Sequence, residues 1–389
     1  MQPSFALPQP DLARHFLLRP DVAFLNHGSF GACPRPVFET YQRWQRELEQ
    51  EPVQFLGRRV NDLLAEARGV LAQYLQTTPA NLVFVPNATF GINIVARSLQ
   101  LGPDDEVLTT NHEYGAVDRT WRFLSSQRGF RYIAQPITTP LDDVDAFVEQ
   151  FWAGVTPRTR VIALSHITSP TALIFPVAEI CRRAREAGIL TVIDGAHAPG
   201  QIELDLDAIG ADFYTGNCHK WLCAPKGAAF LYACPEYQSR LTPLVVSWGY
   251  ESRSPSGSTF QDYFGWTGTS DPSAYLSVPA AIAFQQEHDW PSVRAACHNL
   301  LQELSDAMHD WTGLPHLSAD STLFWSQMRA FPLPPCDPAE VHGRLFEEYL
   351  VEVPLMAWQD QTLVRVSIQA YNTPDDVRRL LDALRALVP

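Results

Sequence analysis

Short apolar runs alternate with helical patterns between about residues 82 and 232, and this alternation restricts the folds open to the chain. A succession of strand, helix and strand is typical of a parallel sheet covered by helices. One connecting helix is clear, because Pro176 opens it, apolar residues recur at helical spacing and Gly188 ends it. The predicted strands are 82–85, 106–109, 131–134, 161–165, 190–194, 213–215 and 228–231. They predict an α/β fold with a large, mostly parallel, seven-stranded sheet.

The residue composition changes after residue 246, and this change indicates a second domain. Residues 247–272 are polar and loop-like with an aromatic cluster, and residues 274–288 predict one long helix. The remainder, 300–389, is typical of a smaller α+β domain, and 389 residues are ample for two domains. We predict an N-terminal arm (1–20), a large domain (21–272) and a small C-terminal domain (273–389), with the arm as a candidate addition to the small domain.

The amino-acid composition indicates which binding partners and which cellular compartment to expect. A net charge of −14 disfavours nucleic acid as a main partner, because phosphate binding favours stripes of Lys and Arg. No apolar stretch approaches the roughly 18 residues of a membrane span, and the N-terminus lacks the pattern of a secretion signal. The seven cysteines lack the spacing of a disulfide framework. We expect a cytoplasmic protein with free thiols and with no membrane or nucleic-acid partner.

Two predicted strands lead into residues that a pyridoxal phosphate (PLP) site needs. Strand 190–194 ends in Asp194, and Lys220 follows strand 213–215. A lysine amine forms the Schiff base with the cofactor aldehyde, and a carboxylate keeps the pyridine nitrogen protonated. Open α/β sheets bind ligands at the carboxyl ends of their strands. The ordered pair therefore predicts PLP as the cofactor, with Lys220 and Asp194 as catalytic residues.

Two histidines flank this pair and leave a second interpretation open. His197 follows Asp194 and is placed to donate to a ring oxygen of the cofactor, and His219 precedes Lys220. A carboxylate with two imidazoles would also suit a metal hydrolase. That alternative leaves Lys220 unexplained, so we predict cofactor binding at both histidines and no metal site.

A helix start supplies the donors that a phosphate group needs. Residues 85–95 leave a strand, turn at small polar residues and open a helix at Thr89. The first turn of a helix offers free N–H groups and the positive end of the dipole. An ordinary N-cap would give the same pattern. Because Lys220 is expected at the same edge of the sheet, we favour phosphate binding at this helix start over an ordinary cap.

His112 and Tyr114 follow strand 106–109, again at a carboxyl end. Either ring could stack on the pyridine face or move a proton, and a partly exposed loop pair is an equal alternative. The sequence does not choose between them, so both are candidate catalytic residues.

These motifs together resemble fold-type I PLP enzymes of the class V aminotransferase family, and within it the isopenicillin N epimerase-like branch. The resemblance extends over nearly the whole chain, through segments 24–31, 87–89, 112–116, 165–169, 194–197, 219–221 and 364–374. It implies the fold-type I architecture, in which a large PLP-binding domain is followed by a smaller α+β domain.

The resemblance also implies roles for individual residues. Arg365 would bind the α-carboxylate of an amino-acid substrate bidentately, as a guanidinium can, and Asn26 would lie near the substrate. Further cofactor contacts would come from Ala88, Thr89, Ser169, Asn217 and His219. Residues 266–269 resemble the segment that reaches the phosphate from a second subunit. A homodimer with shared active sites is thereby implied, with Thr269 as a cofactor-binding residue.

Three reactions fit these residues. Cysteine desulfurases carry a mobile-loop cysteine shortly before the carboxylate-binding arginine, and residues 351–361 contain none. Desulfuration through a persulfide is therefore disfavoured. The main prediction is an epimerase-like activity on an amino acid, the alternative is a C–S lyase, and transamination is the third possibility. A catalytically dead homologue would have lost Lys220, Asp194 or Arg365, and all three are present.

Overall fold

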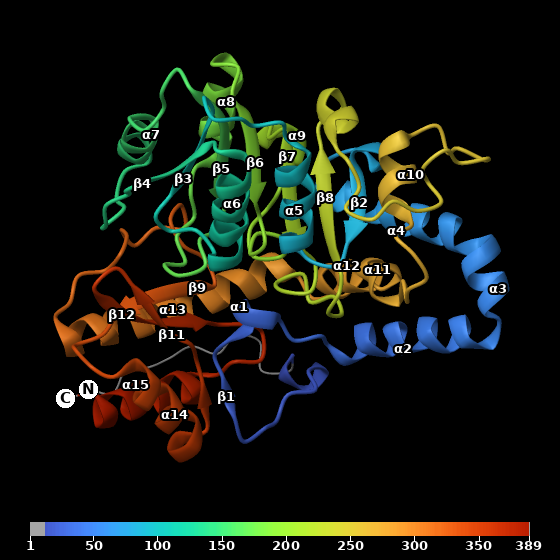
Figure 1. The fold of residues 1–389 in the computed structure, drawn as a ribbon. Coiled ribbons are helices and arrows are strands. Elements are labelled where there is room, and N and C mark those ends of the chain that lie inside the picture. Colours follow the sequence, from blue (N-terminus) through green and yellow to red (C-terminus); the bar gives the residue numbers. More distant parts are fainter. Residues whose placement is uncertain (1–11, 389) are drawn as a thin grey trace.

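A seven-stranded sheet runs through the larger part of the molecule (Figure 1), and the computed structural model describes residues 12–388. The strand order is β2-β8-β7-β6-β5-β3-β4, and β8 is antiparallel to both of its neighbours while the other pairs are parallel. The strands are β2 (Leu82–Val85), β3 (Glu106–Thr110), β4 (Arg131–Gln135), β5 (Thr159–Ser165), β6 (Leu190–Asp194), β7 (Phe213–Asn217) and β8 (Ala229–Ala233). The predicted α/β fold with a mostly parallel seven-stranded sheet is confirmed.

Helices cover both faces of this sheet, because its central strands are apolar on both sides. In β5, Val161 and Ala163 belong to one apolar cluster, whereas Ile162 and Leu164 belong to another. The first cluster is completed by α5 (Ala88–Ser98) and α6 (Gly115–Arg128), and the second by α7 (Val144–Trp152) and α8 (Val177–Glu186). Shorter elements beside them are η3 (Pro79–Asn81), α9 (Leu206–Ile209) and η4 (Pro235–Arg240).

A smaller antiparallel sheet, β11-β12-β9, lies below the large one in Figure 1. Its strands are β9 (Met328–Pro332), β11 (Leu355–Trp358) and β12 (Gln361–Ser367), and its helices are α13 (Trp290–Thr312), α14 (Pro338–Tyr349) and α15 (Pro374–Leu387). The N-terminal strand β1 (Ala23–Phe24) pairs with β10 (Val351–Glu352), so the start of the described chain packs on this C-terminal part. The three domain boundaries remain predictions, and residues 1–11 of the arm lie outside the described residues.

The remaining helices follow the N-terminus or connect the two sheets. They are η1 (Ala13–His15), α1 (His27–Phe30), α2 (Arg35–Gln50), α3 (Pro52–Gln54), η2 (Phe55–Arg59), α4 (Val60–Tyr74), α10 (Thr259–Gly265), α11 (Ser273–Leu276) and α12 (Val278–Glu287). The prediction of one long helix over 274–288 was wrong, because α11 and α12 are separate. Pro279 explains the break, since it has no N–H for the carbonyl of Tyr275 and its ring crowds that carbonyl.

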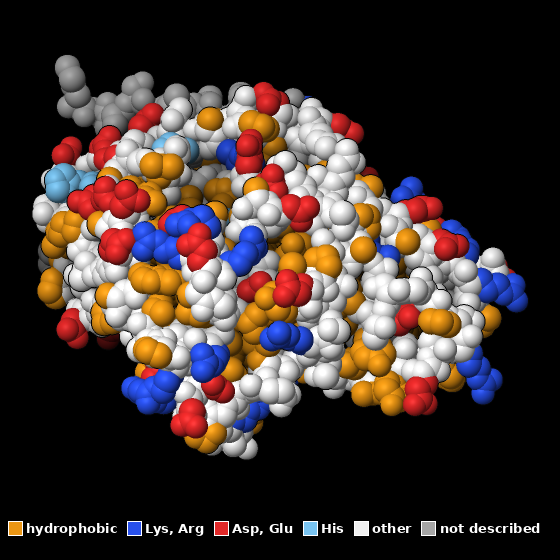
Figure 2. Space-filling model, turned by 90° about the horizontal axis from the view of Figure 1, so that it is seen from above, with side chains coloured by type: hydrophobic (Ala, Val, Ile, Leu, Met, Phe, Trp, Pro, Cys, Tyr) orange, Lys and Arg blue, Asp and Glu red, His pale blue; other side chains and the backbone are white. Residues whose placement is uncertain are grey.

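The surface mixes charges of both signs. Figure 2 shows basic and acidic side chains interspersed with hydrophobic ones over one face, without a continuous basic stripe. Within residues 12–388, no helix has the length and apolar character needed to cross a membrane.

Candidate active site

The carboxyl ends of β6 and β7 bring the two central candidates together. Asp194 is the last residue of β6 and pairs with Thr215 of β7, and Lys220 follows the end of β7 by three residues. The turn after Asp194 needs a residue without a side chain, because a Cβ on Gly195 would lie 2.2 Å from the ring of Tyr214. The parallel register of these two strands therefore places the amine and the carboxylate at one edge of the sheet.

Hydrogen bonds fix the protonation of His197 beside Lys220. The Trp221 indole, which can only donate, lies 3.3 Å from His197 Nδ1, so Nδ1 is the acceptor. Burial lowers the pKa of His197 well below its usual value, so the neutral ring carries its proton on Nε2. That Nε2–H lies 3.2 Å from the Lys220 amine. Burial lowers the pKa of Lys220 to about 7, with Arg365 acting in the same direction and Asp194 opposing, so a neutral amine is accessible near pH 7.

Asp194 is a buried carboxylate, and one of its two oxygens accepts no hydrogen bond within the described chain. Its side chain accepts one hydrogen bond, from the Ala196 N–H at 2.9 Å, and Oδ2 has no donor among residues 12–388. Burial raises the pKa of Asp194, and Lys220 opposes that rise. A buried carboxylate is costly unless it is paired, so this oxygen suits a cationic N–H such as that of a protonated pyridine.

The N-terminus of α5 offers a donor of the kind that a phosphate group needs. Asn87 caps the helix by accepting from the Phe90 N–H at 2.9 Å, and the Ala88 N–H donates to Asn217 Oδ1 at 2.8 Å. The Thr89 N–H has no acceptor in the described part of the chain. His219 Nδ1–H donates to the Ala228 carbonyl at 3.0 Å, which leaves Nε2 free to face a ligand. The structure thus brings Ala88, Asn217 and the open Thr89 N–H together at a helix dipole.

Arg365 is a buried cation without an acidic partner. It is 2 % exposed, and no carboxylate within residues 12–388 forms an ion pair with it or shifts its pKa. Its Nη1 donates to the carbonyl and Oγ of Ser169 at 2.8 and 3.1 Å, and its Nη2 donates to Ser29 Oγ at 3.1 Å. Its buried Nε has no acceptor among the described residues. Burial lowers the pKa of Arg365 only to about 10, so it remains charged. An unpaired guanidinium with a spare N–H suits an incoming carboxylate.

Asn26 and Ser169 reach the site through Arg365. Ser29 accepts from the guanidinium and donates to Asn26 Oδ1 at 2.5 Å, and Asn26 Nδ2 donates to Glu352 at 3.0 Å. Ser169, for which the resemblance implied a place beside the cofactor, holds the guanidinium with both of its oxygens. These contacts orient the cation rather than neutralise it.

The two candidate rings after β3 differ in their surroundings. His112 is fully buried, with Nε2–H donating to the Ile137 carbonyl at 3.1 Å and Nδ1 accepting from Thr171 at 2.8 Å. Burial lowers the pKa of His112 to about 4. Tyr114 is 44 % exposed and lies close enough to Arg365 to raise the pKa of that guanidinium. The geometry therefore favours Tyr114 over His112 as the group that can meet a substrate.

Glu113, between these rings, is a site residue that the sequence reasoning missed. Its carboxylate accepts from Thr110 Oγ at 2.7 Å, and from the N–H and Oγ of Ser165 at 3.0 and 2.6 Å. Ser165 pairs with Asp194 across β5 and β6, and the two carboxylates are close enough to interact electrostatically. Burial raises the pKa of Glu113 to about 7. Its position after the end of strand β3 was the signal available in the sequence.

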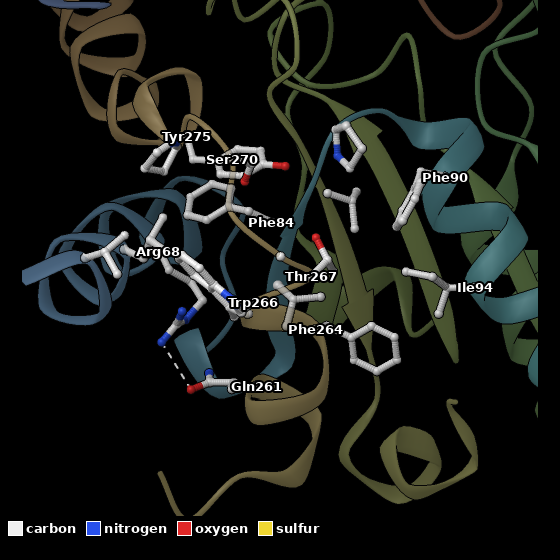
Figure 3. Close-up of a pocket in the computed structure, with 18 residues that line it drawn as sticks. Arg68, Phe84, Phe90, Ile94, Gln261, Phe264, Trp266, Thr267, Ser270 and Tyr275 are labelled. Carbon is white, nitrogen blue, oxygen red and sulfur yellow. Dashed lines mark hydrogen bonds between the residues drawn. The ribbon is translucent and has the colours of Figure 1, made fainter. Parts of the chain in front are cut away.

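Thr269 lies in the segment that follows α10. It is exposed and has no hydrogen bond to another residue of the described chain. The preceding Trp266 and Thr267 line an apolar cavity of about 220 Å³, in which Figure 3 also shows Phe84 and Phe264. The cavity lies between α4, β2, α5 and α10, and its Arg68 donates to Gln261 at 3.1 Å.

The described donors fit PLP and do not form a metal centre. The unpaired Asp194 oxygen suits the ring nitrogen, the α5 N-terminus suits the phosphate, and the neutral Lys220 amine suits the aldehyde. No group of three or more His, Cys, Asp or Glu side chains in residues 12–388 is placed to hold a metal ion. The metal-hydrolase alternative through Asp194, His197 and His219 therefore lacks a ligand set in this part of the chain.

Comparison with known proteins gives a matching family model, similar curated proteins and similar solved structures. The family model described as Aminotransferase class-V matches residues 32–380. An isopenicillin N epimerase from Amycolatopsis lactamdurans is 37% identical over 95% of this chain and 96% of its own length. A putative L-cysteine desulfhydrase from Oryza sativa subsp. japonica is 30% identical over 94% of this chain and 83% of its own. The structure of a C-DES mutant with glycine covalently linked to its PLP cofactor superposes with a TM-score of 0.82, at 22% identity, over 95% of this chain and 97% of that one.

Proposed function

The chain belongs to the class V aminotransferase family and is a PLP-dependent enzyme, and we propose that it inverts the α-carbon of an amino acid or of a molecule with an amino-acid end. The buried, unpaired Arg365 carries the amino-acid part of this proposal. A guanidinium in the interior without a counter-charge is costly unless a ligand brings one, and an α-carboxylate is the matching group. The relatedness to isopenicillin N epimerases at 37% identity supports inversion as the reaction.

Bound PLP supplies an electron sink that acidifies the α-hydrogen of a substrate joined to it. The chain's own residues perform the remaining tasks. Asp194 holds a proton at the ring nitrogen through its unpaired oxygen, and Arg365 fixes the substrate carboxylate. The Lys220 amine, whose pKa burial lowers to about 7, takes the α-proton in its neutral form.

Inversion needs a second acid on the opposite face of the α-carbon. Tyr114 is the candidate, because it is exposed and near Arg365, whereas both ring nitrogens of His112 are occupied. The proposed cofactor contacts of His197, His219, Ala88, Thr89 and Asn217, and the substrate contact of Asn26, complete the site.

C–S bond cleavage is the second candidate, supported by the desulfhydrase relative. Such a reaction needs no second acid at the α-carbon. A persulfide route has little support, because burial raises the pKa of the Cys218 and Cys223 thiols near Lys220 and keeps both protonated. Transamination remains the third candidate and would require net transfer of the amino group.

A homodimer with shared active sites is also part of the proposal. The apolar segment 244–248 is exposed, with Val246 at 67 % and Trp248 at 84 %, and Phe30 beside the site is 72 % exposed. Exposed apolar residues gathered in this way are typical of a subunit interface. Thr269, which has no partner in the described part of its own chain, would then meet the phosphate bound by the other subunit.

One spectroscopic and isotopic experiment tests the function. The purified protein should absorb in the near-visible region, and borohydride reduction should attach the cofactor permanently to the wild-type chain but not to Lys220→Ala. Isopenicillin N and a panel of L-amino acids are then incubated in D₂O. Inversion with deuterium at the α-carbon supports the proposal, pyruvate with sulfide or a thiol indicates the lyase, and a keto acid indicates transamination. A colourless protein that stays colourless with added PLP would overturn the assignment of Lys220.

A further inference from the structure

The short helix α1 (His27–Phe30) touches both Lys220, which follows strand β7 of the large sheet, and Arg365, which lies in strand β12 of the small sheet. His27 lies against the Lys220 backbone, and Ser29, two residues later, contacts the guanidinium. The contacts span 193 and 336 positions of sequence. We infer that α1 is a positioning element that couples carboxylate binding at Arg365 to the placement of Lys220.

The contact to Lys220 runs through a histidine whose tautomer is fixed. His27 is fully buried, and its Nε2–H donates to the Lys220 carbonyl at 3.0 Å. On the other side of the ring, Nδ1 accepts from the Tyr371 hydroxyl at 3.0 Å. Burial lowers the pKa of His27 to about 3, so the ring is neutral and both bonds hold it in one orientation. The ring also packs on Trp221, at 5.0 Å between centroids.

The end of α1 lies directly on the same backbone. Gly31 has φ +71°, and a Cβ there would lie 2.0 Å from the His219 carbonyl oxygen and 2.9 Å from Lys220 Cα. The Gly31 carbonyl accepts from Lys226 at 2.9 Å. Because these backbone atoms are in close contact, a movement of α1 would displace the Lys220 backbone as well.

The other contacts of α1 reach the strand that carries Arg365. Ser29 accepts from Arg365 Nη2, and the Gly28 N–H donates to Ser367 Oγ at 3.2 Å on the same strand, β12. A carboxylate that binds Arg365 has to share the guanidinium with Ser29. The Ser29 hydroxyl also donates to Asn26, so the rearrangement reaches the start of α1.

The inference rests on the proposed roles of Lys220 and Arg365, and it makes His27 and Tyr371 positioning residues. The test uses the holoenzyme and propionate, a carboxylate without an amine. The pH titration of the near-visible band is recorded with and without propionate in wild type, His27→Gln, Tyr371→Phe and Ser29→Ala. We expect propionate to move the titration midpoint in wild type, and the first two variants to lose at least about half of that movement. Ser29→Ala, which removes the hydrogen bond between the guanidinium and α1, should likewise lose at least about half of that movement.

Tyr232→Phe is the matched control, since it removes a buried hydroxyl from β8, away from α1. Its propionate response should equal that of wild type. A wild-type response that persists unchanged in both His27→Gln and Tyr371→Phe would show direct electrostatic action and overturn the coupling. Absence of a propionate response in wild type would also overturn it. Absence of the band itself would instead overturn the proposed function. If one variant fails to fold, the other decides, and Ser29→Ala provides a third reading.

Discussion

At the scale of residues, the site is marked by charges that the described chain leaves unmatched. Arg365 and Asp194 are both buried, and neither forms a hydrogen-bonded ion pair within residues 12–388. A protein interior rarely tolerates such groups without a partner, so a ligand that supplies both missing charges is the physical expectation.

Arg365→Lys should lower kcat/KM for the amino-acid substrate by at least about 30-fold, equivalent to about 2 kcal/mol. An ammonium keeps the charge but loses the planar fork that Ser29 and Ser169 hold in place. Steady-state kinetics provide the measurement. The near-visible band should be kept, because cofactor attachment uses Lys220. Equal kcat/KM values for wild type and Arg365→Lys would show that the substrate carboxylate does not bind at Arg365.

Glu113 should make the cofactor-free protein lose stability as pH rises. Its pKa is raised from 4.5 to about 7 in the folded state, so the folded form binds the proton more tightly than the unfolded form. The stabilisation is present below pH 4.5 and is lost as pH rises towards 7. Glu113→Gln removes this dependence, so the variant should gain on the order of 2 kcal/mol relative to wild type between pH 5 and pH 8. Urea unfolding at both pH values measures the difference, and parallel curves for the two proteins would contradict the expectation.

At the scale of elements, strand ends and two helix starts build the site. β3, β5, β6 and β7 each end beside a functional side chain, and α5 directs its open N–H groups to the same edge. Helix α1 adds the contacts from the N-terminal segment. The backbone at Gly31 lies directly against the backbone of His219 and Lys220, so a side chain at position 31 has no room.

Gly31→Ala should destabilise the protein by about 3 kcal/mol or more, through the unfavourable positive φ and the collision with the His219 carbonyl. Gly69→Ala is the matched control. Gly69 lies inside α4, where a Cβ meets no atom within 4 Å, so alanine should stabilise the helix by about 1 kcal/mol. Thermal unfolding should show a lower midpoint for the first variant and an equal or higher midpoint for the second. A lower midpoint for both would indicate that general glycine loss, rather than the α1 contact, is measured.

At the scale of the whole molecule, two sheets enclose the site and one exposed apolar segment points to a second subunit. Arg365 lies in the small sheet, Asp194 ends a strand of the large sheet, and Lys220 follows the neighbouring strand β7. Segment 244–248 adds an apolar surface that the described chain leaves uncovered.

The protein should therefore behave in solution as a species of twice 43.6 kDa. Light scattering coupled to gel filtration measures this mass. Val246→Glu should shift it towards the monomer and lower activity, because a buried charge weakens an apolar interface and Thr269 would lose its target. Leu323→Glu, at a position with 64 % exposure outside this segment, is the control and should remain dimeric. A monomeric wild type with full activity would exclude shared sites.

Local sequence patterns determined most of the large sheet and the two central site residues. Seven strands, the mostly parallel sheet and the α8 helix follow from periodicity and from breakers such as Pro176 and Gly188, which act on near neighbours in the chain. Asp194 and Lys220 were also visible, because a strand end is itself a local feature. The break between α11 and α12 was equally local, and Pro279 was the missed signal.

Tertiary structure alone decided which candidates meet. His112, Glu113 and Tyr114 are adjacent in sequence, yet one is buried on the Ile137 carbonyl, one is held beside Asp194 and one is exposed near Arg365. The unpaired state of Arg365 and the His27 contact to Lys220 also depend on residues far apart in sequence. Periodicity reports which face of an element is apolar, but burial, pKa and hydrogen-bond partners arise only when distant segments pack. For that reason the sequence determined the framework and the chemical candidates, and the packing of the two sheets around α1 decided their arrangement.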